Sequence, residues 1–105
     1  MIRWHCDPEG MTLELRGHAG WAPHGQDLVC AGASMLVYAL ANRVKQLEAE
    51  GALLRGPVLH LEPGNARIEA VPTPAAESDL RGAFHMTQSG LQLLERQYPG
   101  HVRER

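Results

Sequence analysis

The stretch Gly17–Ser34 reads GHAGWAPHGQDLVCAGAS and separates two parts of the chain that differ in periodicity. Before it, apolar residues alternate with polar ones, and after it they recur every three or four positions. Alternation is typical of strands, and the longer period is typical of a helix. Between the two, Gly20, Pro23 and Gly25 interrupt regular structure, so we expect an exposed loop over Ala19–Gln26. The chain therefore passes from sheet to helix within this stretch.

Two alternating segments, Ile2–Asp7 and Met11–Gly17, precede the loop. The link Asp7–Gly10 reads DPEG, with Pro second and Gly fourth, which is the pattern of a type I turn. We therefore expect the two segments to pair as an antiparallel hairpin. Its inward-facing side chains would be Ile2, Trp4, Cys6, Met11, Leu13 and Leu15.

A helix is expected to begin at Leu28, with Asp27 as its N-cap and Gly51 as its C-terminal stop. Cys30 then lies in the first turn, where backbone N–H groups are unpaired and the helix dipole favours negative charge. Such a position stabilises a thiolate. The apolar stripe of this helix would contain Ala33, Leu36 or Val37, Leu40, Val44 and Leu47.

A second helix is expected after Thr73, with Thr73 as its cap and Pro74 as its first residue. The pair Pro99-Gly100 would end it, and the tail His101–Arg105 would either add an edge strand or stay loose. The apolar stripe of this helix would contain Leu80, Phe84, Thr87, Leu91 and Leu94.

Two further strands, Val58–Glu62 and Ala66–Val71, flank Pro63-Gly64, whose order is typical of a type II turn. The element order is then ββαββα. It predicts a single α+β domain over residues 1–105, with two helices packed on one face of a small, mostly antiparallel sheet.

Composition excludes several classes of protein. The hydrophobic content of 44% is sufficient for a core, and the net charge of −2 without a Lys/Arg run argues against a nucleic-acid partner. No apolar run is long enough to span a bilayer, and we find no signal peptide. We therefore expect a cytoplasmic protein without a membrane partner, whose two cysteines are free thiols.

The central stretch contains the residues of a nucleophilic site. Cys30 is the candidate nucleophile, and His18 and His24 are alternative bases. Asp27 either caps the helix or orients the histidine, and the two roles are compatible. Ser34 lies one turn after Cys30 on the same face, where it either donates to a substrate or bonds to its own backbone. Free N–H groups at the helix start are suited to receive an oxyanion.

A zinc site is the main alternative use of these residues. Cys6, His18, His24 and Cys30 are possible ligands, but the chain has no C-x₂-C and no H-x₃-H pair. The glycines also match neither nucleotide-binding fingerprint. We therefore expect neither a metal nor another cofactor.

The segments GHA at Gly17–Ala19 and GQDLVCAGAS at Gly25–Ser34 resemble the signature of the ribosomal-processing cysteine protease (Prp) family. In that family, a GHA segment precedes a glycine-bearing loop and then G-x-D-[IV]-V-C-A-x-x-S; here Leu28 replaces the Ile or Val. The resemblance implies a homodimeric, cytoplasmic bacterial endopeptidase. Its substrate would be the N-terminal extension of large-subunit ribosomal protein twenty-seven. The nucleophile would be Cys30 and the base His18.

The resemblance also implies roles for the neighbouring residues. Asp27 and Ser34 match supporting positions of the motif, whereas His24 matches none. Cleavage after Phe would require an apolar pocket near the cysteine. Residues expected to contact the substrate are Gly17, Gly25, Trp21, Met35 and Tyr38. The alternatives are a non-catalytic ribosome-associated or peptide-binding module of the same fold, and a thiol redox or zinc protein.

Overall fold

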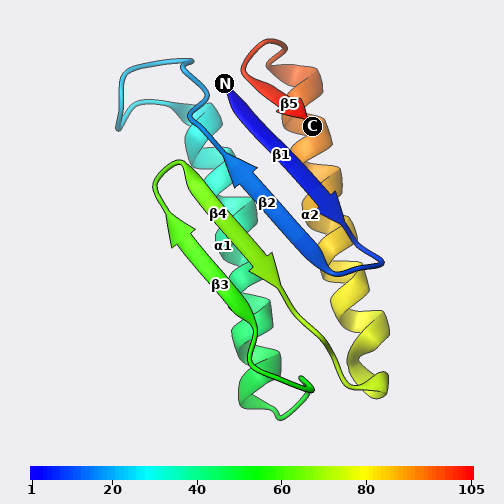
Figure 1. Ribbon diagram of the computed structural model, residues 1–105. Coiled ribbons are helices and arrows are strands. Elements are labelled where there is room, and N and C mark those ends of the chain that lie inside the picture. Colours follow the sequence, from blue (N-terminus) through cyan, green and yellow to red (C-terminus); the bar gives the residue numbers. More distant parts are fainter.

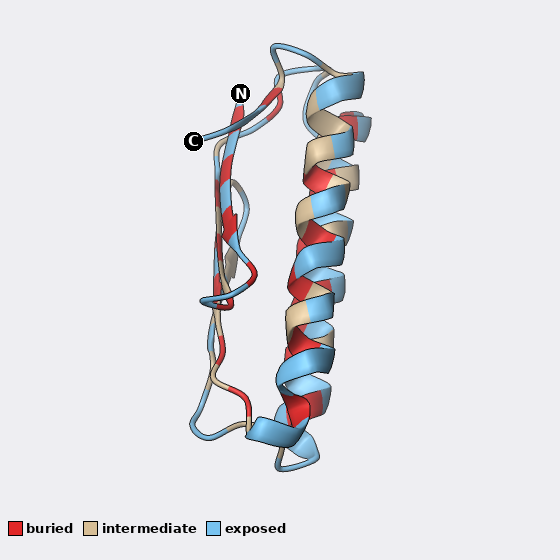
Figure 2. Ribbon diagram, turned by 90° about the vertical axis from the view of Figure 1, so that its right-hand side faces the viewer, coloured by how far each residue is buried: buried red, intermediate tan, exposed pale blue.

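The computed structural model describes all residues from Met1 to Arg105 and consists of two layers (Figures 1 and 2). A five-stranded sheet forms one layer, and two helices lie side by side over one of its faces. Figure 2 shows the buried positions gathered on the surfaces where the layers meet. The predicted α+β class, with both helices on one face, is confirmed.

The sheet has the strand order β3-β4-β2-β1-β5. Only the β1–β5 pair is parallel, so the sheet is mostly antiparallel, as expected. The tail, whose structure the sequence left open, forms the edge strand β5. The strands are β1 (Ile2–Asp7), β2 (Thr12–Arg16), β3 (Val58–Glu62), β4 (Asn65–Glu69) and β5 (Val102–Glu104).

The first hairpin has the predicted orientation but a longer connection. Asp7 pairs with Thr12, so four residues link β1 to β2. The last of these, Met11, is buried and has a φ of +54°, a conformation that non-glycine residues rarely adopt. All six side chains expected to face inward are buried.

Helix α1 (Leu28–Ala49) begins as predicted after its N-cap Asp27. Helix α2 (Glu77–Gln97) begins later than expected, because a 3₁₀ turn, η1 (Pro74–Ala76), precedes it. Thr73 occupies the cap position of that turn but makes no side-chain cap hydrogen bond. The two predicted stripes are buried, apart from the partly buried Leu36 and Leu94.

The second hairpin brings the β3–β4 turn close to the central stretch. Strand β4 runs from Asn65 to Glu69, one residue earlier than predicted at its start and two at its end. Gly64 has a φ of +73°, which the predicted type II turn requires at this position. Its carbonyl accepts a hydrogen bond from Gly17 N–H (2.8 Å), so this turn lies against the end of β2.

Candidate active site

A cavity of about 550 Å³ lies where the central stretch, the start of α1 and the β3–β4 turn meet. It collects residues that are far apart in the sequence, because β2 and β4 are neighbours in the sheet while α1 packs over the sheet. Its lining includes seven predicted site residues: Gly17, His18, Gly25, Asp27, Cys30, Ser34 and Tyr38.

The predicted nucleophile Cys30 is half-buried in the first turn of α1. Its Sγ accepts a hydrogen bond from Ala19 N–H, at 3.2 Å. Reactive cysteines are often found at helix starts of this kind. His18 lines the same cavity, and no hydrogen bond joins its ring to Cys30 Sγ in this structure.

Asp27 connects the loop to the helix start. Its Oδ1 accepts from Val29 N–H and Cys30 N–H, both at 3.0 Å, and its Oδ2 accepts from Trp21 N–H (3.0 Å) and Ala22 N–H (3.4 Å). Burial by itself would raise the pKa of this carboxyl group. The hydrogen bonds from Cys30, Trp21 and Ala22 outweigh burial and hold its pKa below the ordinary value.

This cap changes the expected position of an oxyanion site. We expected free N–H groups at the start of α1, but Asp27 already accepts the N–H groups of Val29 and Cys30. Ala31 N–H donates to the Asp27 carbonyl as part of the helix. The donor that faces Cys30 Sγ instead comes from Ala19, in the loop.

The His18 ring lies against the β3–β4 turn. A Cβ atom added to Gly64 would lie 2.6 Å from His18 Nε2 and 3.0 Å from its Cε1. A side chain at position 64 would therefore occupy the space of the ring. Gly17, with a φ of +92°, supplies the positive φ that the chain adopts as it leaves β2 towards His18.

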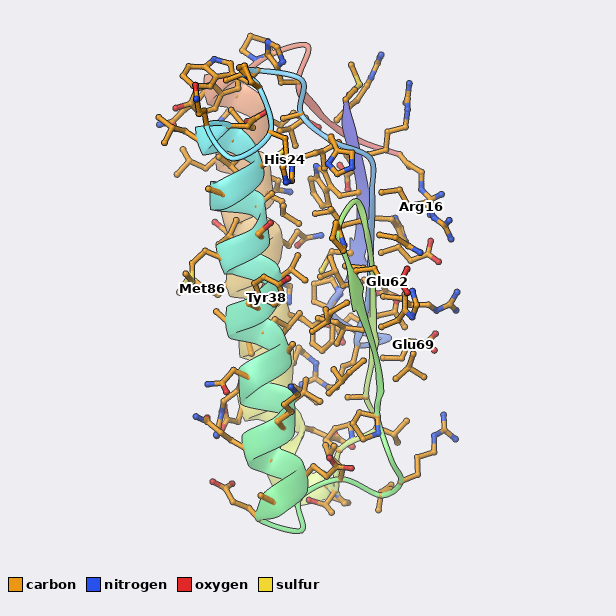
Figure 3. All side chains as sticks on the ribbon, turned by 90° about the vertical axis from the view of Figure 1, so that its left-hand side faces the viewer. Arg16, His24, Tyr38, Glu62, Glu69 and Met86 are labelled. Atoms are coloured by element: carbon orange, nitrogen blue, oxygen red, sulfur yellow. The ribbon has the colours of Figure 1, made fainter.

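The predicted substrate-contact residues divide into two groups. Gly17, Gly25 and Tyr38 line the cavity, and so does His24, the alternative base. Figure 3 shows Tyr38 on α1 and His24 in the loop at the N-terminal end of α1. Contrary to expectation, Trp21 and Met35 do not line it. Trp21 packs edge-on against Tyr98, with ring centroids 6.0 Å apart, and Met35 is 67% exposed on α1.

One contact of the site has no signal in the sequence. His101, in the turn after α2, lies with Nδ1 2.9 Å from the carbonyl oxygen of Ala19, the residue that donates to Cys30. No motif or periodicity points to His101, because the contact joins residues 82 positions apart.

The other cysteine is placed differently. Cys6 is buried in the core, with its thiol 3.6 Å from the carbonyl oxygen of Phe84. Burial, together with the charges of Asp7 and Glu104, raises the pKa of Cys6 to about 12. Cys6 is thus a packing residue, as its alternation predicts. No three His, Cys, Asp or Glu side chains lie together in a way that could hold a metal ion.

Neither helix is both long enough and apolar enough to cross a membrane.

Comparison with known sequences identifies the family. The family model of the cysteine protease Prp matches residues 1–103. The ribosomal processing cysteine protease Prp of Bacillus subtilis (strain 168) is 46% identical over 43 residues. Those residues are 41% of this chain and 38% of the Bacillus protein, so this match spans well under half of either.

Comparison with solved structures extends the likeness of fold to the whole chain. The S. aureus Prp structure with a covalently linked product peptide has a TM-score of 0.72 at 24% identity, covering 98% of this chain and 94% of its own. The S. aureus Prp structure with a substrate peptide has a TM-score of 0.72 at 22% identity, and the match covers 100% of this chain and 98% of the S. aureus chain. SMU.848 from Streptococcus mutans has a TM-score of 0.67 at 26% identity, and the match covers 100% of this chain and 92% of SMU.848. Because the family model extends over nearly the whole sequence, this chain belongs to the cysteine protease Prp family.

Proposed function

We propose that this protein is an endopeptidase in which Cys30 is the nucleophile and His18 the general base. The observation that carries the proposal is the environment of Cys30. This residue lies at a capped helix start, its sulfur accepts a hydrogen bond from Ala19 N–H, and His18 lines the same cavity. Membership of a cysteine protease family supports the same assignment. Asp27 supports the site by joining the loop to the helix, and Ser34 faces the cavity one turn beyond Cys30.

The reaction begins when His18 takes the proton of the Cys30 thiol. The sulfur attacks the peptide carbonyl carbon, a C–S bond forms, and the electron pair of the carbonyl moves to its oxygen. Collapse of this intermediate breaks the C–N bond, and His18 gives its proton to the leaving amine. Water, deprotonated by His18, then attacks the thioester carbon; the C–S bond breaks, the new carboxyl terminus is released, and His18 returns the proton to the Cys30 sulfur. The oxyanion receives hydrogen bonds from the loop, where Ala19 N–H already faces the sulfur.

The proposed substrate is the N-terminal extension of large-subunit ribosomal protein twenty-seven, cut after a Phe residue. The lining of the cavity supports this choice, because an aromatic side chain of the substrate would contact apolar residues from both layers. These residues are Leu15, Ala33, Val37, Leu61 and Ala66. Substrate and product peptides occupy the S. aureus Prp structures named above. We further propose that the protein works in the cytoplasm as a homodimer that binds neither nucleic acid nor membrane.

The test is cleavage of a peptide that copies the junction between the extension and the mature ribosomal protein, followed by mass spectrometry. Wild-type protein should cut once, after Phe, and Cys30→Ala should not cut, while Cys6→Ala serves as the matched control and should remain active. Peptide binding without cleavage by the wild type would instead favour the non-catalytic peptide-binding module. Cleavage by a folded Cys30→Ala protein would exclude the proposed nucleophile.

The choice of base has its own comparison. His18→Ala should lower turnover by roughly 10²–10⁴-fold, the usual contribution of a general base. His24→Ala should have a much smaller effect, because His24 lines the cavity from the loop and lies outside the motif. A larger loss in His24→Ala than in His18→Ala would reverse the two assignments.

A further inference from the structure

We propose that His101 is a positioning residue for the nucleophile, acting through the backbone of Ala19. The proposal rests on the proposed function, since it concerns how the reactive state of Cys30 is maintained. It assigns a role to the C-terminal turn, which neither the motif nor the central stretch includes.

The contacts form a short chain from the turn to the sulfur atom. His101 Nδ1 lies 2.9 Å from Ala19 O, and Ala19 N–H donates to Cys30 Sγ at 3.2 Å. A carbonyl oxygen can only accept, so Nδ1 carries the hydrogen in this contact. Ala19 is itself buried, at 3% exposure, so its carbonyl has little access to water as a substitute partner.

The position of His101 is set by its own backbone contacts. Its carbonyl accepts from Ile2 N–H (2.9 Å), and its N–H donates to Tyr98 O (3.1 Å). The next residue, Val102, begins β5 and pairs with Ile2 of β1. The imidazole ring is therefore carried by a segment attached to the edge of the sheet, close to where α2 ends (Figure 1).

The loop consequently has two anchors of different kinds. Asp27 holds the N–H groups of Trp21 and Ala22, whereas His101 holds the carbonyl group of Ala19. Only the second anchor acts on the residue whose N–H faces the sulfur. Without His101, the Ala19 carbonyl loses its partner, the backbone of residue 19 can rotate, and its N–H loses alignment with Cys30 Sγ. The thiolate, and the oxyanion that follows it, then lose a donor.

The experiment compares His101→Ala, His101→Asn and His101→Gln. The amide nitrogen of Asn lies two bonds beyond Cβ, as Nδ1 does, whereas that of Gln lies one bond further, as Nε2 does. Asn should therefore restore the bond to Ala19 O, and Gln should not. His5→Ala is the matched control, because His5 is an exposed histidine on β1 and takes no part in the contacts described above.

The first readout is the rate of Cys30 alkylation by iodoacetamide as a function of pH. In His101→Ala and His101→Gln the profile should move to higher pH by about half a unit to one unit, which makes alkylation near neutral pH roughly three- to tenfold slower. In His101→Asn and His5→Ala it should match the wild type. An unchanged profile in a folded His101→Ala protein would overturn the proposal, as would equal effects of Asn and Gln.

The second readout is peptide cleavage, in which His101→Ala should lower kcat by about the same factor and leave KM unchanged. Thermal unfolding of each variant identifies a general loss of stability, which would affect Asn and Gln alike. Alkylation requires no substrate, so the two proposals can fail separately. Absence of cleavage by the wild type would refute the protease assignment, whereas the alkylation profiles test His101 independently.

Discussion

Replacing Gly64 by Ala tests whether the β3–β4 turn holds His18 in place. The substitution has two effects that can be separated. One is backbone strain, because Gly64 has a φ of +73°. The other is contact with His18, whose Nε2 would lie 2.6 Å from the new Cβ.

Both effects can be given a magnitude. A left-handed backbone costs an L-residue about 1–2 kcal/mol. An ordinary contact needs about 3.5 Å, so the ring must retreat by roughly 0.9 Å from the new methyl group. His18 is exposed and can move, so we expect little further loss of stability. A displacement of about 1 Å in a catalytic group, however, can lower the rate about 10²-fold.

The matched control is Gly51→Ala at the end of α1. Gly51 has a φ of +72°, and a Cβ atom there would meet nothing within 4 Å. The two variants therefore carry the same strain, and only Gly64→Ala touches His18. Chemical denaturation should show similar losses of unfolding free energy in both, of about 1–2 kcal/mol.

Peptide cleavage then separates the variants. Gly51→Ala should cleave at nearly the wild-type rate, and Gly64→Ala should be about 10²-fold slower. Equal turnover in the two folded variants would refute the reasoning, because His18 would then not depend on the turn for its position. A loss of stability in Gly64→Ala far beyond that of Gly51→Ala would show that the turn, rather than the ring, gives way.

Three further predictions follow from the contacts of Asp27 and Cys6. Asp27→Asn should keep the cap of α1 but present an N–H₂ group to Trp21 N–H, so amide exchange should rise in the loop and not in the helix. Asp27→Ala should raise amide exchange in both the loop and the helix and should lower stability by about 1 kcal/mol. Because folding lowers the pKa of Asp27, the contribution of its carboxylate to stability should be complete above pH 3.8, the ordinary pKa, and should be lost as the pH falls through the lowered pKa. Acid unfolding of Asp27→Asn should not show this loss of stability. Folding raises the pKa of the Cys6 thiol from 9.0 to about 12, so the thiol should lower the stability of the protein as the pH rises through this range. The decline due to Cys6 should be at most about 1.4 kcal/mol per pH unit, and Cys6→Ala should show a shallower decline in chemical denaturation at these pH values.

Much of the fold could be predicted from the sequence because its signals are local. Alternation placed Trp4 and Cys6 inside, and the helical period placed Phe84 and Leu91 on the buried stripe of α2. Asp27 was identified as a cap from its position before Leu28, and the structure bears this out. These predictions succeed because strand period, helix period and capping depend on residues only a few positions apart.

The boundaries of the second helix and the structure of the C-terminal tail were harder to predict from the sequence. Thr73 has the residue type of a cap, but it precedes a 3₁₀ turn rather than α2 itself and makes no side-chain cap hydrogen bond. The three residues of β5 carry no pattern long enough to predict a strand, and they form one because the edge of β1 is available for parallel pairing.

The sequence by itself determined the order of the elements and the position of Cys30 in the first turn of a capped helix. Tertiary structure alone decided the contacts of the loop and of the candidate base: Gly64 against His18, Trp21 against Tyr98, and His101 on the carbonyl of Ala19. The donor at the sulfur is Ala19 N–H, while the N–H groups of Val29 and Cys30 donate to the Asp27 side chain. The physical reason is that each of these contacts is made by individual groups, mostly distant in sequence, whose proximity follows from the packing of sheet and helices and leaves no periodic pattern in the chain.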